Sequence, residues 1–356
     1  MTFLTQALLA ALITLVMVLW LRRPALRFGL IDHPGGRKRH GAPVPLTGGI
    51  AMVVGFFAAL ALSFDSLASY KVLLVAFLLL GVVGVLDDVG ELSPRSKLAA
   101  QLIAAVLMTS WAGLFLVSLG DIFGRGPIEL KHWGIPLTVF AVIAVINSIN
   151  MLDGADGLAG GLVFVILASF AALAYFVTLD VNATKLLLVM AGAVAGFLFF
   201  NAPFPWRRDR HRIFMGDAGS MALGYAIAWF SVDLTQRPER AVAPVLMLWI
   251  VAIPLLDLFT VTVRRVIRRR DPALPDRGHV HHLLMRKGWS AARVGTLLIV
   301  FQAALAAGGV ALWLAGVPQW LLFAGFVVVG IAFVALFLFP GWWLIRRRPR
   351  RVDQSS

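Results

Sequence analysis

Two adjacent carboxylates close an apolar run near the middle of the N-terminal half. The run ends at Asp87 and Asp88, and Lys97 follows shortly afterwards. Paired carboxylates at the end of a membrane-buried segment are unfavourable unless they bind a partner. Because neighbouring carboxylates do not ionise independently, one can hold a proton near neutral pH, and the pair can also bind a hard cation through oxygen. Both chemistries are open to this pair, beside the plain alternative of a polar helix end.

A second polar group separates two later apolar runs. Asn147, Asn150, Asp153 and Asp156 recur at every third position, which places them along one ridge wherever the segment is helical. The segment is not an EF-hand loop, because the glutamate that closes such a loop is missing. Four polar side chains packed between apolar runs favour a ligand site over a solvated turn.

A further carboxylate, Asp217, stands at the start of another apolar run, between Gly216 and Gly219. Glycine at these positions permits the close approach of a bulky ligand. Asp217 is also a plausible N-cap for the following helix, and the two roles are compatible. Asp257, inside a later apolar run, is expected to pair with an arginine such as Arg264.

Cationic and imidazole side chains occupy two more loops. Lys38 and His40 lie in a loop rich in glycine and proline, whose backbone N–H groups can approach an anion. His279, His281 and His282 follow an arginine-rich loop. A zinc site is one interpretation, but no His-Glu-x-x-His motif accompanies the histidines. Phosphate binding fits the basic surroundings better, and polar loops with incidental histidines are the plain alternative.

Together, these loops offer carboxylates, amides, cations and glycines, but no cysteine. Disulfides, thiolate metal sites and cysteine nucleophiles are therefore excluded. The set suits Mg²⁺-dependent phosphoryl transfer, in which one or two carboxylates and the substrate phosphates hold the ion and nearby cations neutralise the transition state. A site at the edge of a membrane implies one lipid substrate and one soluble substrate.

The elements that carry these residues are membrane-spanning helices. The 356 residues are 60% hydrophobic and 14% charged, against about 25% charged in soluble proteins, and the mean hydropathy is +0.87. Apolar runs of about 18–22 residues are long enough to cross a bilayer as helices. We therefore predict an all-α, polytopic transmembrane bundle of about eleven spans. The expected spans cover residues 3–21, 47–66, 70–86, 98–119, 134–151, 158–178, 185–200, 217–234, 241–261, 291–314 and 317–345.

The basic residues predict the orientation of this bundle. With the N-terminus outside and the C-terminus in the cytoplasm, few of the 32 Lys and Arg residues fall outside, as the positive-inside rule requires. Those on the outer side are Lys71, Arg125, Lys131, Lys185, Arg237 and Arg240. The net charge of +14 is thus explained by topology and not by nucleic-acid binding. We expect one membrane domain, residues 1–345, and a basic cytoplasmic tail, residues 346–356.

The motifs occur together, and in this order, in one known family. The chain resembles the polyprenyl-phosphate N-acetylhexosamine-1-phosphate transferases, the MraY/WecA family, over about residues 1–345. The motifs that carry the resemblance are Asp87-Asp88 with Arg95-Ser-Lys97, residues 147–161, residues 214–220 and His279-Val-His281-His282. The His-x-His-His form and the loop of residues 43–49 are closer to the WecA-like branch.

The resemblance implies that undecaprenyl phosphate attacks the β-phosphorus of a UDP-N-acetylhexosamine, with UDP-GlcNAc as the default, and releases UMP. It implies Mg²⁺ as the cofactor, with Mn²⁺ as a substitute. The residues expected to hold the metal are Asp217 and Asn150. Those expected to be catalytic are Asp87, Asp88 and Asp156. Those expected to bind substrate are Lys38, His40, Lys97, Asn147, Asp153, His279, His281 and His282.

The same resemblance implies a bacterial inner-membrane enzyme whose site faces the cytoplasm and whose product starts a cell-envelope glycan such as lipopolysaccharide. Expected partners are undecaprenyl phosphate, the UDP-sugar, the lipid bilayer and, by analogy, a second copy of the chain. Direct attack by the lipid phosphate is favoured over a phosphorylated aspartate intermediate, because a phosphate dianion is already nucleophilic. A transporter, an intramembrane metallohydrolase and a lipid-binding scaffold are the alternative functions.

Overall fold

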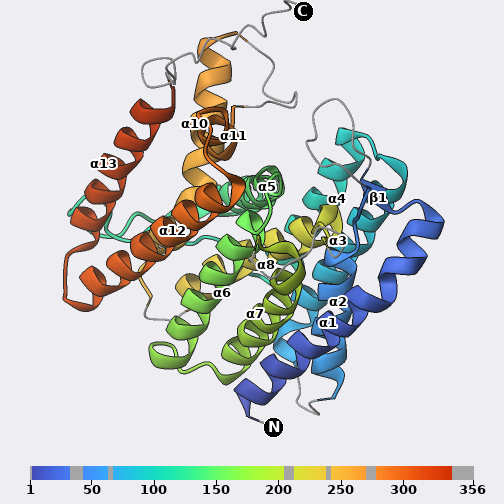
Figure 1. Cartoon of the computed structure of the whole chain (residues 1–356). Helices are drawn as coiled ribbons and strands as arrows, with labels where there is room; N and C mark the ends of the chain where they lie inside the picture. Colours follow the sequence, from blue (N-terminus) through green and yellow to red (C-terminus); the bar gives the residue numbers. More distant parts are fainter. Residues whose placement is uncertain are drawn as a thin grey trace, which may run out of the picture.

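The computed structural model describes residues 2–32, 43–62, 67–203, 212–237, 242–269 and 278–338. The described chain is almost entirely helical, as expected (Figure 1). Two short antiparallel strands, β1 (Ile31–Asp32) and β2 (Val44–Pro45), pair beside the end of the first helix. The helices are α1 (Phe3–Phe28), α2 (Gly48–Ala61), α3 (Lys71–Gly90), α4 (Pro94–Val106), α5 (Gly134–Leu152), α6 (Leu158–Phe176), α7 (Val181–Asn201), α8 (Gly216–Gln236), α9 (Val245–Ile250), α10 (Ala252–Ile267), α11 (Val280–Arg286), α12 (Ala291–Leu314) and α13 (Gln319–Leu338).

Several of these helices have the length and composition of membrane spans. Within the described residues, seven helical segments are long and apolar enough to cross a bilayer. They are Phe3–Phe28, Ala68–Gly90, Lys131–Leu152, Leu158–Phe176, Val181–Asn201, Ala291–Leu314 and Gln319–Leu338. Large apolar side chains such as Phe140 and Val328 are exposed on their outer surfaces, where water would disfavour them and lipid would not. The chain is a multi-pass membrane protein.

Two expected spans end differently from the prediction. The span expected at 47–66 contains α2, an apolar helix of only 14 residues. The span expected at 98–119 consists of most of α4 and then a short π-helical turn, Leu107–Trp111. Gly113 then takes a positive φ of 63°, a conformation that ends a right-handed helix and that glycine adopts without strain.

The span expected at 241–261 is two helices, because the chain breaks at Val251 between α9 and α10. Pro254 has no N–H to donate to Ile250 O. The buried side chain of Gln302 on α12 satisfies the break instead. Its Nε2 donates to Ile250 O at 2.7 Å, and its Oε1 accepts from Ile253 N at 2.9 Å. A single polar side chain thus makes an irregular backbone tolerable inside an apolar bundle.

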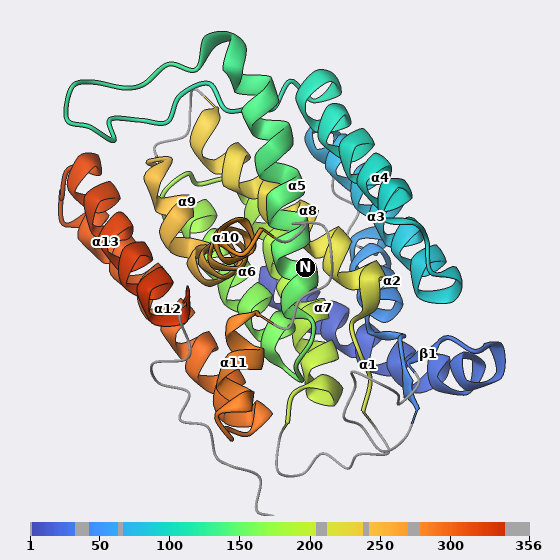
Figure 2. The ribbon, with the colours of Figure 1, turned by 90° about the horizontal axis from the view of Figure 1, so that it is seen from above.

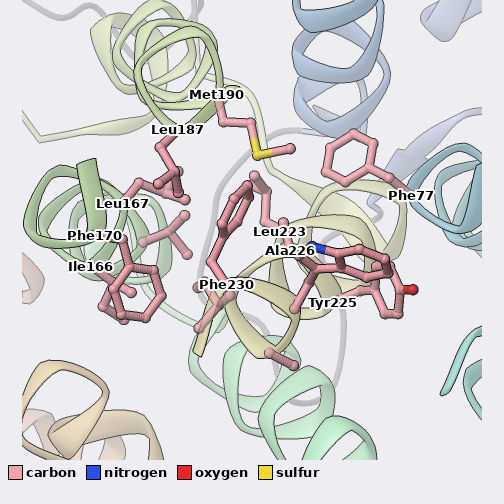
Figure 3. Close-up of a cluster of buried hydrophobic side chains, with 14 of the residues drawn as sticks. Phe77, Ile166, Leu167, Phe170, Leu187, Met190, Leu223, Tyr225, Ala226 and Phe230 are labelled. Atoms are coloured by element: carbon pink, nitrogen blue, oxygen red, sulfur yellow. The ribbon is translucent and has the colours of Figure 1, made fainter. Parts of the chain in front are cut away.

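Helix α8 forms the centre of the bundle. It packs against α3, α5 and α6, and the view from above shows α5 and α8 between α3 and α4 on one side and α9 and α10 on the other (Figure 2). Leu223 and Phe230 of α8 meet Phe170 of α6, Met190 of α7 and Phe77 of α3 in one buried cluster (Figure 3). Because neighbours enclose α8 along its length, its first turn is held rigidly at one end of the bundle.

Candidate active site

The helix ends bring the predicted carboxylates together. Helix α3 ends just after Asp87 and Asp88, α4 begins just before Lys97, α5 ends just after Asn150, and α8 begins just before Asp217. Since α3 and α5 each run toward this end, and α4 and α8 each start from it, their polar termini share one end of the bundle. The sequence prediction that separate loops converge is therefore confirmed for these side chains by direct contacts.

Lys97 joins the two halves of this centre. Its Nζ lies 2.9 Å from Asp87 Oδ2 and 3.0 Å from Asp217 Oδ2. The other oxygen of Asp217 accepts a hydrogen bond from Asn150 Nδ2 at 2.7 Å, and the same nitrogen donates to Ser220 Oγ at 2.9 Å. The ammonium balances two carboxylates that would otherwise repel each other in a partly buried setting. We call Asp87, Lys97, Asn150 and Asp217 the carboxylate centre.

The contacts of Asp88 differ from those of Asp87. Its Oδ1 accepts from Asp217 N at 2.9 Å and its Oδ2 from Ala218 N at 3.3 Å. A carboxylate from α3 therefore caps the free N–H groups at the start of α8. The alternative in which Asp217 caps its own helix is wrong, since the N-cap position is Met215 and Asp217 lies inside the first turn. Asp87 is the member of the pair that faces Lys97.

Glycines make this capping contact possible. Gly216 has a φ of 72°, and a Cβ there would overlap Asp88 Oδ2 and lie 3.0 Å from its Cγ. A Cβ on Gly219 would lie 2.9 Å from Gly49 Cα of α2. The sequence suggested that these glycines admit a ligand. In the structure they admit the backbone and side chains of neighbouring helices, which press against α8 from two sides.

Asn147 and Asp156 are committed to protein contacts. Asn147 Nδ2 donates to Gln101 Oε1 at 2.8 Å and so ties α5 to α4. Asp156 is buried, and its Oδ1 lies 3.0 Å from Arg212 Nε and 2.5 Å from Arg212 Nη2. Arg212 was missed from sequence because it belongs to a run of arginines that topology alone explains. Its guanidinium also lies 5.1 Å above the ring of Phe214.

Asp153 lies between the carboxylate centre and the histidines. Burial raises the pKa of Asp153 well above its usual value, and the charges of Asp217, Asp88 and Asp156 raise it further, while a hydrogen bond from the Gly216 N–H acts in the opposite direction. In the absence of a bound cation, the surroundings of Asp153 therefore favour the protonated form of its carboxyl group.

This shift predicts a pH-dependent change in stability. A carboxyl group whose pKa is raised by folding stabilises the fold at low pH, and that stability is lost as the pH rises through the folded-state pKa. In Mg²⁺-free buffer, Asp153→Asn should therefore raise the melting temperature by at least about 2 °C at pH 8 and by less at pH 5, where the wild type has lost less of this stability. Asp156→Asn, in the same turn, should lower it because Arg212 loses its partner. An equal gain at both pH values for Asp153→Asn would contradict the ionisation argument.

The three histidines gather beside the turn that carries Asp153. His279 Nδ1 lies 2.7 Å from Asp257 Oδ2, so Asp257 meets a histidine and not the arginine that was expected. His281 is completely buried, and neither ring nitrogen has a hydrogen-bond partner. Burial lowers the pKa of His281 well below its usual value, and His282 and His279 add to this. A Cβ on Gly154 would lie 2.9 Å from His281 Nε2. Lys38 and His40 lie outside the described residues.

The carboxylate centre has the donor chemistry of a magnesium site. Among the described residues, no group of three or more histidine, aspartate or glutamate side chains is arranged to hold a metal by itself. Mg²⁺ ordinarily needs only one or two carboxylates, with substrate phosphates and water as its other ligands. Asp87 and Asp217 supply oxygen donors around a single cation, Lys97. The residues therefore fit a hard divalent ion that arrives with a phosphate substrate.

Comparisons with known proteins place this chain in a family. The sequence model of glycosyl transferase family 4 matches residues 70–235. Undecaprenyl-phosphate alpha-N-acetylglucosaminyl 1-phosphate transferase of Salmonella typhi is 35% identical over 99% of this chain and 95% of its own length. The chain belongs to the family of this transferase. The transferase of the same name from Yersinia pestis is 34% identical over 100% and 98% of the two chains, and that from Haemophilus influenzae is 36% identical over 98% and 96%.

The region matched by the glycosyl transferase family 4 model contains the whole carboxylate centre. It runs from the start of α3 to the end of α8, and it stops before α9, α10 and the histidines. The similarity to the transferases extends over nearly the full chain, so the histidine-bearing part is also covered at that level. The membership predicted from motifs is thus confirmed.

Proposed function

We propose that the chain transfers N-acetylglucosamine 1-phosphate from UDP-GlcNAc to undecaprenyl phosphate and releases UMP. The printed names of its full-length relatives support both the transferred group and the acceptor. The observation that carries the proposal is the Lys97 ammonium held between Asp87 and Asp217 at the end of a membrane bundle. A lipid phosphate and a soluble nucleotide sugar can meet only at such a boundary. The product would start a cell-envelope glycan.

In this reaction, an oxygen of the lipid phosphate attacks the β-phosphorus of the donor. The bond from that phosphorus to the bridging oxygen breaks, and UMP leaves with the bridging oxygen. Lys97 neutralises phosphate charge, Asp87 orients the attacking phosphate or takes its proton, and Asp88 holds Asp217 in place through the start of α8. Positioning and charge neutralisation supply most of the catalysis in phosphoryl transfer.

The contacts of Asp88 support direct attack over a phosphorylated aspartate. A carboxylate that serves as a nucleophile must present a free oxygen to phosphorus. Both oxygens of Asp88 accept backbone N–H groups of α8, so phosphorylation of either oxygen would weaken the cap. Asp87 is bound by Lys97 and by Leu92 N at 2.8 Å.

We further propose that Mg²⁺ acts at the carboxylate centre. Asp217 and Asn150, the two residues expected from the sequence, would hold it, and Asp87 would supply a further oxygen donor. When bound, the ion neutralises charge on the donor diphosphate. Lys97 would then be the positive side chain that the protein itself supplies beside the ion. The acidic neighbours Asp88 and Asp153 make the site favourable for a divalent cation.

We also propose that the site faces the cytoplasm of a bacterial inner membrane and that about eleven spans cross it. The distribution of Lys and Arg supports this orientation, because the expected spans put nearly all of them on the same side as the carboxylate centre. Nucleotide sugars are charged, soluble compounds, so a donor site on the cytosolic side gives them direct access.

A reconstitution experiment tests the proposed function. Purified protein in detergent is given undecaprenyl phosphate and each of UDP-GlcNAc, UDP-GalNAc and UDP-glucose, and UMP release is measured with Mg²⁺, with Mn²⁺ and with EDTA. We expect release with UDP-GlcNAc, support by either metal, and none with EDTA. No release with any donor would refute the transferase function, while a preference for another UDP-sugar would refute only the identity of the sugar. Release that needs zinc would instead favour a metallohydrolase.

A further inference from the structure

Asp257 is a buried carboxylate that the carboxylate centre does not use. It lies in α10 and is only 2% exposed. Burying a carboxylate is costly unless hydrogen-bond donors or positive charges compensate. The contacts of Asp257 therefore indicate why α10 carries an acidic residue at this position.

Both oxygens of Asp257 bind the segment that begins α11. Oδ2 lies 2.7 Å from His279 Nδ1, and Oδ1 accepts from Val280 N at 2.7 Å. His279 occupies the N-cap position of α11, but its own side chain makes no capping hydrogen bond. Asp257 thus caps the histidine-bearing helix from a neighbouring helix, as Asp88 caps α8.

The contact with Asp257 also selects the protonation of His279. A carboxylate whose other oxygen accepts a backbone N–H offers an acceptor to the ring, so Nδ1 must carry hydrogen. In the neutral ring, the lone pair is then on Nε2, and that nitrogen can accept a hydrogen bond. Without the carboxylate, either tautomer would be available.

A second residue of α10 holds the same segment. Arg264 lies about two turns after Asp257, and its Nη1 donates to Gly278 O at 2.6 Å. Its Nη2 donates to Phe337 O in α13. The backbone is therefore attached to α10 immediately before and immediately after His279. These attachments hold the segment in place, and the contact of Nδ1 with Asp257 orients the ring.

The orientation of His279 is passed to the turn beside the carboxylate centre. Its ring is stacked on that of His281, with centroids 6.0 Å apart and planes 16° apart. His281 in turn contacts Gly154, where no side chain larger than hydrogen fits without displacement. Asp153, the preceding residue, accepts a hydrogen bond from the backbone N–H of Gly216 in α8. A chain of contacts thus runs from Asp257 to the first turn of α8.

We propose that Asp257 is a positioning residue that holds His279 in its Nδ1–H form and caps α11, so that Nε2 is presented to the nucleotide-sugar donor. This inference rests on the proposed transferase function for its substrate, but its geometric part does not. It predicts that Asp257 acts through His279 and not through folding alone. The KM for the acceptor lipid should be unchanged, because Asp257 touches no residue of the carboxylate centre directly and reaches it only through two histidines and the turn at Asp153.

The test is Asp257→Asn in the full-length protein. Asparagine keeps an oxygen for Val280 N, but its NH₂ group then faces His279 Nδ1 and forces hydrogen onto Nε2. The ¹⁵N spectrum of histidine-labelled protein should show His279, assigned by its loss in His279→Gln, changing from the Nδ1–H to the Nε2–H pattern. The kcat/KM for UDP-GlcNAc should fall about 10–100-fold, through KM for the donor, with KM for undecaprenyl phosphate unchanged.

Two further variants separate positioning from damage to the fold. Thr260→Val, on the next turn of α10, removes a buried hydroxyl that bonds only to its own helix at Leu256 O, and it should leave the spectrum and kinetics unchanged. Asp257→Asn combined with His279→Gln should lose no more activity than His279→Gln alone. An unchanged histidine spectrum, or fully additive losses, would overturn the proposal. If the wild-type protein releases no UMP, the proposed function fails, and the spectrum still decides the role of Asp257.

Discussion

Asp217→Asn should reduce UMP release by at least about 10³-fold, the loss expected when a charged group that stabilises a transition state is removed. The amide has nearly the same shape, so packing around α8 is retained. It has no charge, however, and its NH₂ group can face Lys97 Nζ or Asn150 Nδ2, both of which are donors in the wild type. The protein would lose the carboxylate that we propose as a ligand for Mg²⁺, and Lys97 would be left with Asp87 alone.

The control for Asp217→Asn is Asp121→Asn, in the loop before α5. Asp121 Oδ1 accepts from Arg125 N and Gly126 N, and asparagine can accept both bonds equally well. Asp121→Asn should therefore keep wild-type turnover. Turnover, the Mg²⁺ concentration for half-maximal rate and the melting temperature are measured for both variants. Wild-type turnover in Asp217→Asn with an unchanged metal requirement would remove Asp217 from the site.

Gly216→Ala should reduce turnover by about 10²-fold, a loss typical of a misplacement of about 1 Å at a reacting centre. Two effects add. A residue with a Cβ is strained by about 1–2 kcal/mol at the positive φ of Gly216. The new methyl group would also overlap the carboxylate of Asp88, so the cap on α8 must move, and Asp217 moves with it. Because bulk and not charge is changed, the metal requirement should stay the same while the rate falls.

Gly90→Ala is the matched control for this steric prediction. Gly90 is the last residue of α3, close to Asp88 in sequence, and a Cβ there would meet nothing within 4 Å. Its activity should equal that of the wild type. Melting temperatures show whether Gly216→Ala still folds, and the rate is compared at saturating donor and acceptor. Full turnover in a folded Gly216→Ala protein would show that the Asp88 cap does not position the centre.

Much of the carboxylate centre could be predicted from sequence because charge is rare in this chain. Asp87, Asn150 and Asp217 each stand where an apolar run starts or stops, and alternation of helix direction brings such ends to the same side. The association of Lys97 with Asp87 also follows from their places on consecutive helices. These inferences need only hydropathy, the length of a span and the cost of placing charge in lipid.

The partners of individual side chains could not be predicted in this way. Asp87 and Asp88 are chemically identical neighbours, and only the packing of α3 against α8 gives one to Lys97 and the other to backbone N–H groups. Arg212 is hidden among arginines that the positive-inside rule already explains. The break at Val251 is an intermediate case, because Pro254 signals it while the compensating Gln302 is distant in sequence.

The Gln302 side chain has a mechanical consequence. It joins α12 to both pieces of the interrupted span, and α12 also packs against α11. A change in the tilt of α12 would therefore be transmitted to α9, α10 and α11 together.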